Sequence, residues 1–265
     1  MNGVRHFLLA LQFFTRVPVT GRLAEWVGFS PAMLRASAAH FPGVGWLVGA
    51  VAAAVFLVAR SGLPGVAGAF AAALLSTIAT VLLTGAFHED GLADVADGLG
   101  GSADRVRALE IMKDSRIGAF GAIALVLAMG AKLALLATLA AQGTAAVVTA
   151  LLGAHVLSRL APLFLIRWLP YVGAEGTDSK AKPLTDAIGR GALALGVLYA
   201  VPAAALLLLA HGGMQGAASL LACLLGALYM GRLLRRRLQG FTGDGLGATQ
   251  QVCELAIYLA LAWHA

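Results

Sequence analysis

Residues 118–141 read GAFGAIALVLAMGAKLALLATLAA, an uninterrupted apolar run with one charged residue, Lys132. A helix needs about 20 mostly apolar residues to cross a bilayer, so this run alone predicts a membrane span. Other runs along the chain have the same character. The complete set of predicted spans is 43–59, 66–87, 118–141, 144–166, 191–210, 215–231 and 247–263. The sequence therefore predicts an all-α fold, a polytopic membrane helix bundle of about seven transmembrane helices.

The composition of the 265-residue chain agrees with lipid as its solvent. Hydrophobic residues make up 60% of the chain and charged residues 12%, whereas soluble domains carry about 25% charged residues. No long polar linker divides the chain, so we expect residues 1–265 to form a single integral membrane domain. The first twenty residues hold a short apolar run flanked by Arg5, His6 and Arg16. This pattern predicts an N-terminal amphipathic helix in the membrane interface, and a signal peptide is not indicated.

The basic residues collect in three long connections, which are 88–117, 167–190 and 232–246. The other connections are short and nearly uncharged. Seven spans place the three basic connections on one side of the membrane together with the N-terminus, and the positive-inside rule makes that side cytoplasmic. The net charge of +6 is thus explained by membrane anchoring. No basic patch is interleaved with aromatic residues, so we expect no nucleic-acid partner.

Two features lie inside the predicted spans. Gly45 and Gly49 form a small-xxx-small pair, which predicts a close contact with another helix. Lys132 lies deep in its span, and we expect its side chain to extend toward the far interface. A role for Lys132 in a transport path is the alternative.

The most informative polar stretch is residues 88–98, HEDGLADVADG. On a helix, the spacing of Asp90, Asp94 and Asp97 places all three carboxylates on one face. Their mutual repulsion must be compensated, and an all-oxygen cluster suits a hard cation such as Mg²⁺, with Mn²⁺ as a second candidate. A solvated acidic helix face is the alternative. The metal site is favoured because the stretch directly follows a span in a chain with only 13 acidic residues.

A second element, MKDSRIG at 112–118, places one acid between two cations at the mouth of the next span. Lys113 and Arg116 are suited to hold phosphate oxygens, and Asp114 could complete the metal site or accept a proton. A positive-inside anchor with a salt bridge is an equally good explanation of this element by itself. Together the two elements indicate phosphoryl transfer, which needs positioning and charge neutralisation more than covalent chemistry.

These two motifs resemble the cobalamin synthase family, the membrane enzymes called adenosylcobinamide-GDP ribazoletransferases. The resemblance is carried by FHEDGLADVADG at 87–98 and LEIMKDSRIG at 109–118. Shorter matching stretches extend it over most of the chain, namely LQFFTRVPV at 11–19, FPGVGWLVG at 41–49, SRLAP at 158–162 and GFTGDGLGATQQVCE at 240–254.

The resemblance implies a bacterial plasma (inner) membrane enzyme with several spans, whose acidic catalytic loop, 88–118, is cytoplasmic. It implies that the cobinamide phosphate of adenosylcobinamide-GDP is transferred to α-ribazole or α-ribazole 5′-phosphate, with release of GMP and a requirement for Mg²⁺. Membrane lipid is then a further partner, and a homo-oligomer is compatible with the sequence.

Carried over residue by residue, the resemblance assigns the metal to Asp90, Asp94 and Asp97. Asp114 becomes a fourth ligand or the base that takes the proton of the ribazole hydroxyl. Lys113 and Arg116 contact the pyrophosphate.

Four further residues are candidates for substrate binding. On a helix His88 points away from the three carboxylates, so a supporting or structural role is expected for it. Arg159 is a candidate to reach the site from the cytoplasmic half of its span. Thr242 and Asp244 could bind corrinoid or guanine, but a plain helix-start turn explains both residues equally well.

Two other functions compete with this interpretation. CDP-alcohol phosphatidyltransferases also use a helical aspartate cluster with a divalent metal, but they carry arginine where this chain has Asp94. A transporter would place its acids near the bilayer midplane, whereas these acids follow a span.

Overall fold

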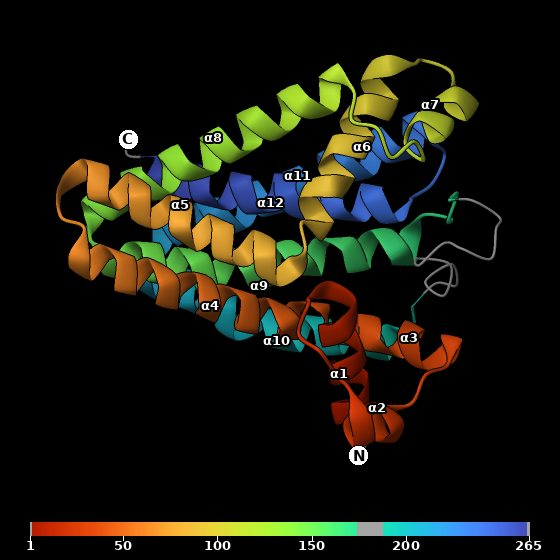
Figure 1. Ribbon diagram of the computed structural model, residues 1–265, viewed down its shortest axis with the longest axis horizontal. Helices are drawn as coiled ribbons and strands as arrows, with labels where there is room; N and C mark the ends of the chain where they lie inside the picture. Colours follow the sequence, from red (N-terminus) through yellow and green to blue (C-terminus); the bar gives the residue numbers. More distant parts are fainter. Residues whose placement is uncertain (1, 174–187, 264–265) are drawn as a thin grey trace.

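The computed structural model describes residues 2–173 and 188–263, and Figure 1 shows its helices in chain order. Most of the predicted connection 167–190 therefore lies outside the described residues. The elements are α1 (Asn2–Phe14), α2 (Gly21–Val27), α3 (Pro31–Ser37), the 3-10 helix η1 (Ala38–His40), α4 (Phe41–Gly62), α5 (Gly65–Thr84), α6 (Phe87–Gly101), α7 (Arg105–Ile111), α8 (Ala119–Gln142), α9 (Thr144–Trp168), α10 (Arg190–Ala210), α11 (Gly213–Arg237) and α12 (Gly243–Ala262). In the described ranges, β structure is limited to one isolated bridge between Tyr171 and Phe241.

Six helices in the described part of the chain are long and apolar enough to cross a membrane. They are α4, extended by the helical stretch before it, and α5, α8, α9, α10 and α11. The prediction of a polytopic all-α membrane bundle is confirmed. The seventh predicted span, 247–263, does form a helix, α12, but α12 is not among the six. Its polar residues Gln250, Gln251 and Glu254 are buried inside the protein, which explains how a less apolar helix is accommodated.

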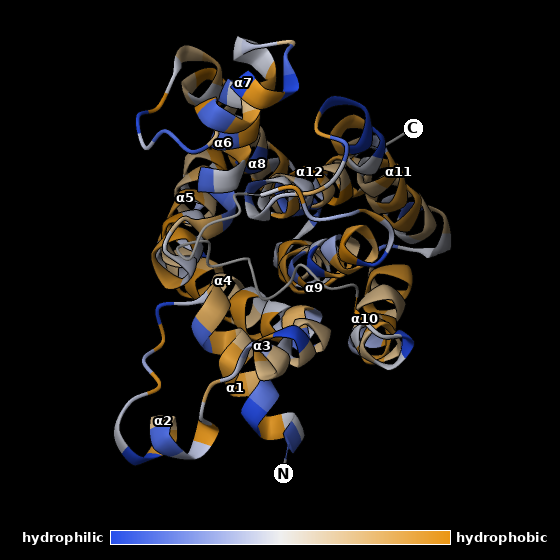
Figure 2. Cartoon of the chain, turned by 90° about the vertical axis from the view of Figure 1, so that its right-hand side faces the viewer, coloured by the Kyte–Doolittle hydropathy of each residue, from blue (hydrophilic) through white to orange (hydrophobic). Residues whose placement is uncertain are grey.

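The bundle is built around α9. This helix packs against α4, α10 and α12, and the view from the end in Figure 2 shows it among these three helices. The contact with α4 is close at the predicted glycine pair, because a Cβ atom on Gly45 would lie 2.8 Å from the Val156 Cα and one on Gly49 would lie 3.0 Å from the Leu152 Cα. The small-xxx-small prediction is thus confirmed.

The expectation for Lys132 is wrong. Its side chain is only 2% exposed, and its Nζ lies 2.7 Å from Oε1 of Glu254 on α12. Because a lysine ammonium held in a buried ion pair is satisfied within the protein, it does not need to reach an interface.

The N-terminal helix α1 has one face buried in the bundle and one exposed. Leu9, Leu11 and Phe14 are buried, whereas Val4 is 58% exposed. The Phe14 ring packs edge-on against Phe41 of α4, with ring centroids 4.2 Å apart. This two-faced helix fits the amphipathic pattern of the sequence, and its buried face attaches it to the bundle.

Candidate active site

The acidic stretch that follows α5 is a helix. Gly85 and Ala86 both adopt left-handed backbone angles, with φ of 66° and 58°, and this turn ends α5 and starts α6 at Phe87. Asp90, Asp94 and Asp97 all lie on α6, which places them on a common face, as their spacing predicts. The segment 88–118 is therefore built mainly of two helices, α6 and α7.

Asp97 has a clear structural partner. Its Oδ2 accepts a hydrogen bond from the Gly118 N–H at 2.7 Å, and its Oδ1 accepts one from the Gly121 N–H at 2.8 Å. Gly118 is the N-cap of α8 and Gly121 lies in its first turn, where backbone N–H groups lack partners within the helix. Asp97 thus joins α6 to the start of α8. The absence of a side chain at Gly118 and Gly121 makes this possible, because a Cβ atom at either position would overlap the Asp97 carboxylate.

A fourth carboxylate, that of Asp244, reaches the same region from the far end of the chain. It lies in the first turn of α12, which packs against α6. The two backbones are close enough that a Cβ atom on Gly91 would lie 2.7 Å from the Asp244 carbonyl oxygen. On the other side of the contact, a Cβ atom on Gly247 would lie 3.3 Å from the His88 Cα. Two glycines therefore bring Asp244 against the acidic face of α6.

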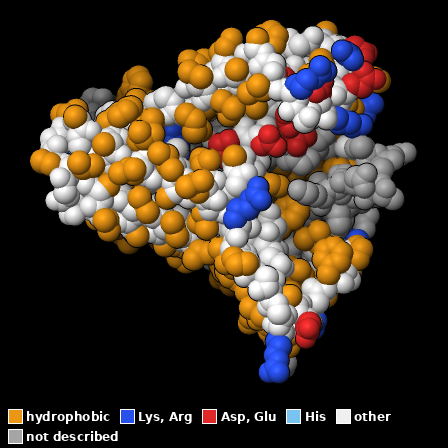
Figure 3. All heavy atoms as spheres, viewed as in Figure 1, with side chains coloured by type: hydrophobic (Ala, Val, Ile, Leu, Met, Phe, Trp, Pro, Cys, Tyr) orange, Lys and Arg blue, Asp and Glu red, His pale blue; other side chains and the backbone are white. Residues whose placement is uncertain are grey.

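The electrostatics of these carboxyl groups show that they interact. Burial raises the pKa of Asp94 to about 7, and three neighbouring carboxylates add to the rise: Asp244, Asp90 and Asp97. Burial also raises the pKa of Asp244 to about 6, again with a contribution from Asp90. Like charges that are close together disfavour ionisation unless a cation is present. In Figure 3, acidic side chains gather at the end of the molecule where α6 and α7 lie in Figure 1, whereas much of the rest of this face is hydrophobic.

The donor set of this cluster suits a hard divalent cation, because it consists of carboxylate oxygens whose charge is uncompensated. Among the described residues, however, no three His, Cys, Asp or Glu side chains are placed to hold a metal ion together. The cluster thus suits a metal ion in the type of its donor atoms and in its negative charge. Asp97 accepts two backbone hydrogen bonds at the start of α8, and the charge that a cation would compensate lies on Asp90, Asp94 and Asp244.

Asp114 and Arg116 form an exposed pair at the mouth of α8. The Arg116 Nη2 lies 2.6 Å from the Asp114 Oδ2, and the Arg116 backbone N–H donates to Oδ1 at 3.0 Å. These hydrogen bonds lower the pKa of Asp114 to about 2. Lys113 beside them is exposed. The pair matches the salt bridge considered for this element, and the low pKa makes Asp114 a weak proton acceptor.

The structure places His88 in a buried aromatic contact. Its ring stacks on Phe14, with centroids 5.6 Å apart and an angle of 7° between the rings. Burial, followed by the nearby Arg159 charge, lowers the pKa of His88 well below its usual value. A neutral, packed histidine fits the structural role expected for this residue.

The other two candidates for substrate binding are also buried. Thr242 Oγ1 accepts a hydrogen bond from the Gly245 N–H at 3.0 Å, so Thr242 is the N-cap of α12. The helix-start explanation thus holds for Thr242. Arg159, on α9, is 3% exposed and donates to the His155 carbonyl at 2.9 Å. Its guanidinium belongs to the polar interior beneath α6.

The sequence predicts Asp244 as a substrate contact and gives no reason to group it with Asp90 and Asp94. The signal that was present is the stretch TGDG at 242–245, a cap followed by an acid in the first helical turn. Nothing in that local pattern says which helix lies opposite. Glu89 and Glu254, which are both buried, were likewise not singled out.

Comparisons with known proteins give the relatives of this chain. The family model described as Cobalamin-5-phosphate synthase matches residues 6–262. A protein of Albidiferax ferrireducens is 57% identical over an alignment of 278 positions, which covers 98% of this chain and 98% of that protein. A protein of Polaromonas sp. is 56% identical over 98% of this chain and 96% of its own. One of Leptothrix cholodnii is 47% identical over 98% and 95%.

All three relatives carry the name "Adenosylcobinamide-GDP ribazoletransferase". No solved structure matches the chain. The family match extends over both halves of the acidic cluster, on α6 and at the start of α12. The chain belongs to the cobalamin-5-phosphate synthase family.

Proposed function

We propose that this protein transfers the cobinamide phosphate of adenosylcobinamide-GDP to α-ribazole or α-ribazole 5′-phosphate, with release of GMP, in the assembly of the cobalamin nucleotide loop. The relatives' names support the substrate and the class of reaction. The observation that carries the proposal is the meeting of Asp244 with Asp90 and Asp94, because it concentrates uncompensated negative charge at one end of a membrane bundle.

We propose Mg²⁺ as the resident cation, with Mn²⁺ as a substitute, held by Asp90, Asp94 and Asp244. When bound, such a cation neutralises phosphate oxygens and the charge that develops on the leaving group. In the absence of a cation, the neighbouring negative charges of such a site raise the pKa of its carboxyl groups. Asp97 contributes by holding α6 against the start of α8.

The chemical step needs no covalent intermediate with the protein. A ribose hydroxyl of α-ribazole attacks the phosphorus on the cobinamide side, a new P–O bond forms, the P–O bond to GMP breaks, and the hydroxyl proton passes to solvent water. Such a transition state is loose, so positioning and charge neutralisation contribute more than a strong base. Lys113 and Arg116 lie at the exposed mouth of α8 and can hold phosphate oxygens there. Asp114 orients Arg116.

We propose that the acidic end of the bundle faces the cytoplasm of a bacterial cell and that the spans cross its plasma membrane. The basic last turn of α11 lies at this same end, because the Arg237 Nη2 donates to the Ser102 carbonyl at 2.6 Å and to the Leu99 carbonyl at 3.1 Å. Arg105 of α7 in turn donates to the Leu238 carbonyl at 2.7 Å. Basic residues at one end of the spans favour the cytoplasmic side.

The function is tested by GMP release from purified protein held in detergent or liposomes. We expect release only when adenosylcobinamide-GDP, α-ribazole and Mg²⁺ are all present, and we expect excess EDTA to abolish it. A CDP-activated alcohol with a lipid acceptor should yield no CMP. Release of CMP, or a folded protein that releases no GMP under any of these conditions, would contradict the proposal.

Stability should depend on pH in a direction set by Asp94 and Asp244. The ordinary pKa of an aspartate in an unfolded chain is about 3.9, and folding raises it to about 7 for Asp94 and to about 6 for Asp244. The folded state therefore binds more protons, and the stability contributed by these groups is present below about pH 4 and is lost as the pH rises to about 7. We expect the Tm of metal-free protein in detergent to fall over this range.

Millimolar Mg²⁺ should raise the Tm most at the upper end of that range, because the cation binds the ionised cluster of the folded state. In Asp94→Asn the fall of the Tm with pH should be smaller, since an amide does not ionise. A fall of the same size in the variant and in the wild type would show that Asp94 is not its source.

Asp114→Asn should have only a modest effect, about tenfold or less on the rate of GMP release. The pKa of about 2 argues against a role as a base, and the carboxylate serves mainly to orient Arg116. The pH profile of the rate should keep its shape, because a group with this pKa is ionised throughout the working range. A loss well beyond tenfold, together with loss of the low-pH limb on which the rate rises with pH, would restore Asp114 as the proton acceptor.

A further inference from the structure

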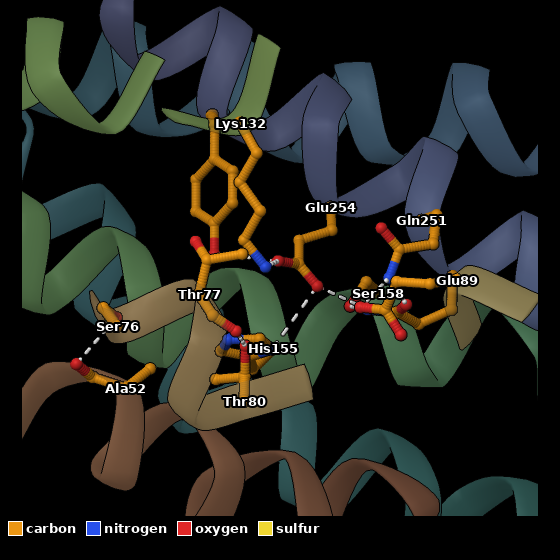
Figure 4. A network of polar contacts seen from close by, with 12 residues as sticks. Ala52, Ser76, Thr77, Thr80, Glu89, Lys132, His155, Ser158, Gln251 and Glu254 are labelled. Atoms are coloured by element: carbon orange, nitrogen blue, oxygen red, sulfur yellow. Dashed lines mark hydrogen bonds and ion pairs between the residues drawn. The ribbon is translucent and has the colours of Figure 1, made fainter. Parts of the chain in front are cut away.

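Four charged side chains are buried in the bundle beneath the acidic cluster. They come from four helices and are at most 8% exposed: Lys132 of α8, Arg159 of α9, Glu89 of α6 and Glu254 of α12. Two cations and two carboxylates make the group neutral by itself, so it needs no charged ligand to balance it. Figure 4 shows Lys132, Glu254 and Glu89 joined through polar side chains of α12.

Glu254 is the centre of this network. Its Oε1 lies 2.7 Å from the Lys132 Nζ and accepts a hydrogen bond from the Tyr258 hydroxyl at 3.2 Å. Its Oε2 accepts a hydrogen bond from the Gln250 Nε2 at 2.5 Å and lies 3.4 Å from the His155 Nδ1. A buried carboxylate with this many partners tolerates little movement of α12 relative to α8 and α9.

The network continues from α12 to the acidic helix. The Gln251 Nε2 donates to Oε1 of Glu89 at 3.1 Å and also to Oε1 of Gln250 at 3.1 Å. Glu89 directly precedes Asp90. A continuous series of contacts thus connects Lys132 on α8 to the first turn of α6 through α12, while Asp97 connects the far end of α6 to the start of α8.

A buried ion pair is seldom the contact that stabilises the packing of two helices most. Two charges lose their hydration when they enter a protein interior, and apolar replacements of such a pair are often neutral or stabilising. In lipid, small apolar residues already bring helices together, as Gly45 does between α4 and α9. What polar contacts add is a defined position, because a slip of one turn, about 5.4 Å, separates every donor from its acceptor.

We propose that Lys132, Glu254 and Gln251 are positioning residues that fix α12 along α6 and so hold Asp244 against Asp90 and Asp94. Asp244 and Gln251 lie on the same helix about two turns apart. The contact of Gln251 with Glu89 therefore fixes the position along the α6 axis at which Asp244 meets Gly91. The inference rests on the proposed function, since it explains how the candidate metal ligands are kept together.

The test measures Mn²⁺ affinity by electron paramagnetic resonance on purified protein without substrates, next to the rate of GMP release. Gln251→Leu and the double variant Lys132→Met/Glu254→Gln are the informative changes, because the double variant leaves no charge of the ion pair without its partner. We expect the Mn²⁺ Kd to rise about tenfold or more in both, as is usual when residues that orient metal ligands are lost. The rate of GMP release at saturating substrate should fall in parallel.

Ser76→Ala is the matched control. Ser76 is buried and donates from α5 to the Ala52 carbonyl of α4 at 2.8 Å, so this variant also loses a buried contact between helices, away from α12. It should keep the wild-type Mn²⁺ Kd within about twofold even where its Tm falls by as much as that of the test variants.

Folded test variants with the wild-type Kd and rate would overturn the inference and leave the proposed function intact. Wild-type protein that neither binds Mn²⁺ nor releases GMP would contradict the proposed function, and the inference would fall with it. If Gln251→Leu does not fold, Gln251→Glu and the double variant decide, because glutamate keeps the size of the side chain but opposes Glu89.

Discussion

Replacing Asp244 with asparagine is expected to lower GMP release about 100-fold or more at saturating substrates. The amide keeps the size of the side chain and its place in the first turn of α12. It removes the negative charge of Asp244, which acts on Asp94. We propose that this charge helps to bind the cation. Loss of residues that only orient metal ligands costs about 10- to 100-fold, so loss of a ligand should reach at least the upper end of that range. The rate should be measured across Mg²⁺ concentrations, because part of it should return at high Mg²⁺.

Asp104→Asn is the control for this prediction. Asp104 is an exposed aspartate in the same acidic region, and its Oδ1 accepts a hydrogen bond from the Arg107 N–H at the start of α7. Asparagine caps a helix about as well as aspartate, so this variant should keep nearly full activity. An Asp244→Asn variant as active as the control would place Asp244 outside the reaction and leave the acidic face of α6 to act alone.

Replacing Gly91 with alanine should have the second large effect, through packing. The added Cβ atom would lie 2.7 Å from the carbonyl oxygen of Asp244 and 3.0 Å from its Cα. Both are backbone atoms, so α6 and α12 must separate to make room. We expect a loss of activity of about tenfold or more and a lower Tm, although alanine is the better helix former by about 0.8–1.0 kcal/mol. Rates and Tm values are measured on the same preparation.

Gly130→Ala separates packing from helix propensity. Gly130 lies within α8, and a Cβ atom there would meet nothing within 4 Å. Alanine at this position should leave activity unchanged and keep or raise the Tm. If Gly91→Ala behaves in the same way, the close approach of α12 to α6 is not needed for function.

The local features of this protein could be predicted from its sequence. Apolar runs of span length predicted the membrane helices, because in lipid a backbone must satisfy its own hydrogen bonds. The spacing of Asp90, Asp94 and Asp97 predicted one face of one helix, because a helix repeats every 3.6 residues. The motifs at 87–98 and 109–118 indicated the family, which the match over residues 6–262 bears out.

Contacts between distant segments could not be predicted in this way. The sequence predicted that Lys132 extends toward the far interface, because its partner Glu254 lies on another helix and more than a hundred residues away. Thr242 and Asp244 could be understood as a helix start, and the structure keeps that role for Thr242 while it brings Asp244 to α6. Periodicity and capping depend on residues a few positions apart, and the chain itself determined them. Which helix faces α6, and at which position along its axis, depends on how whole helices pack at glycines such as Gly91. Only the tertiary structure decided this arrangement.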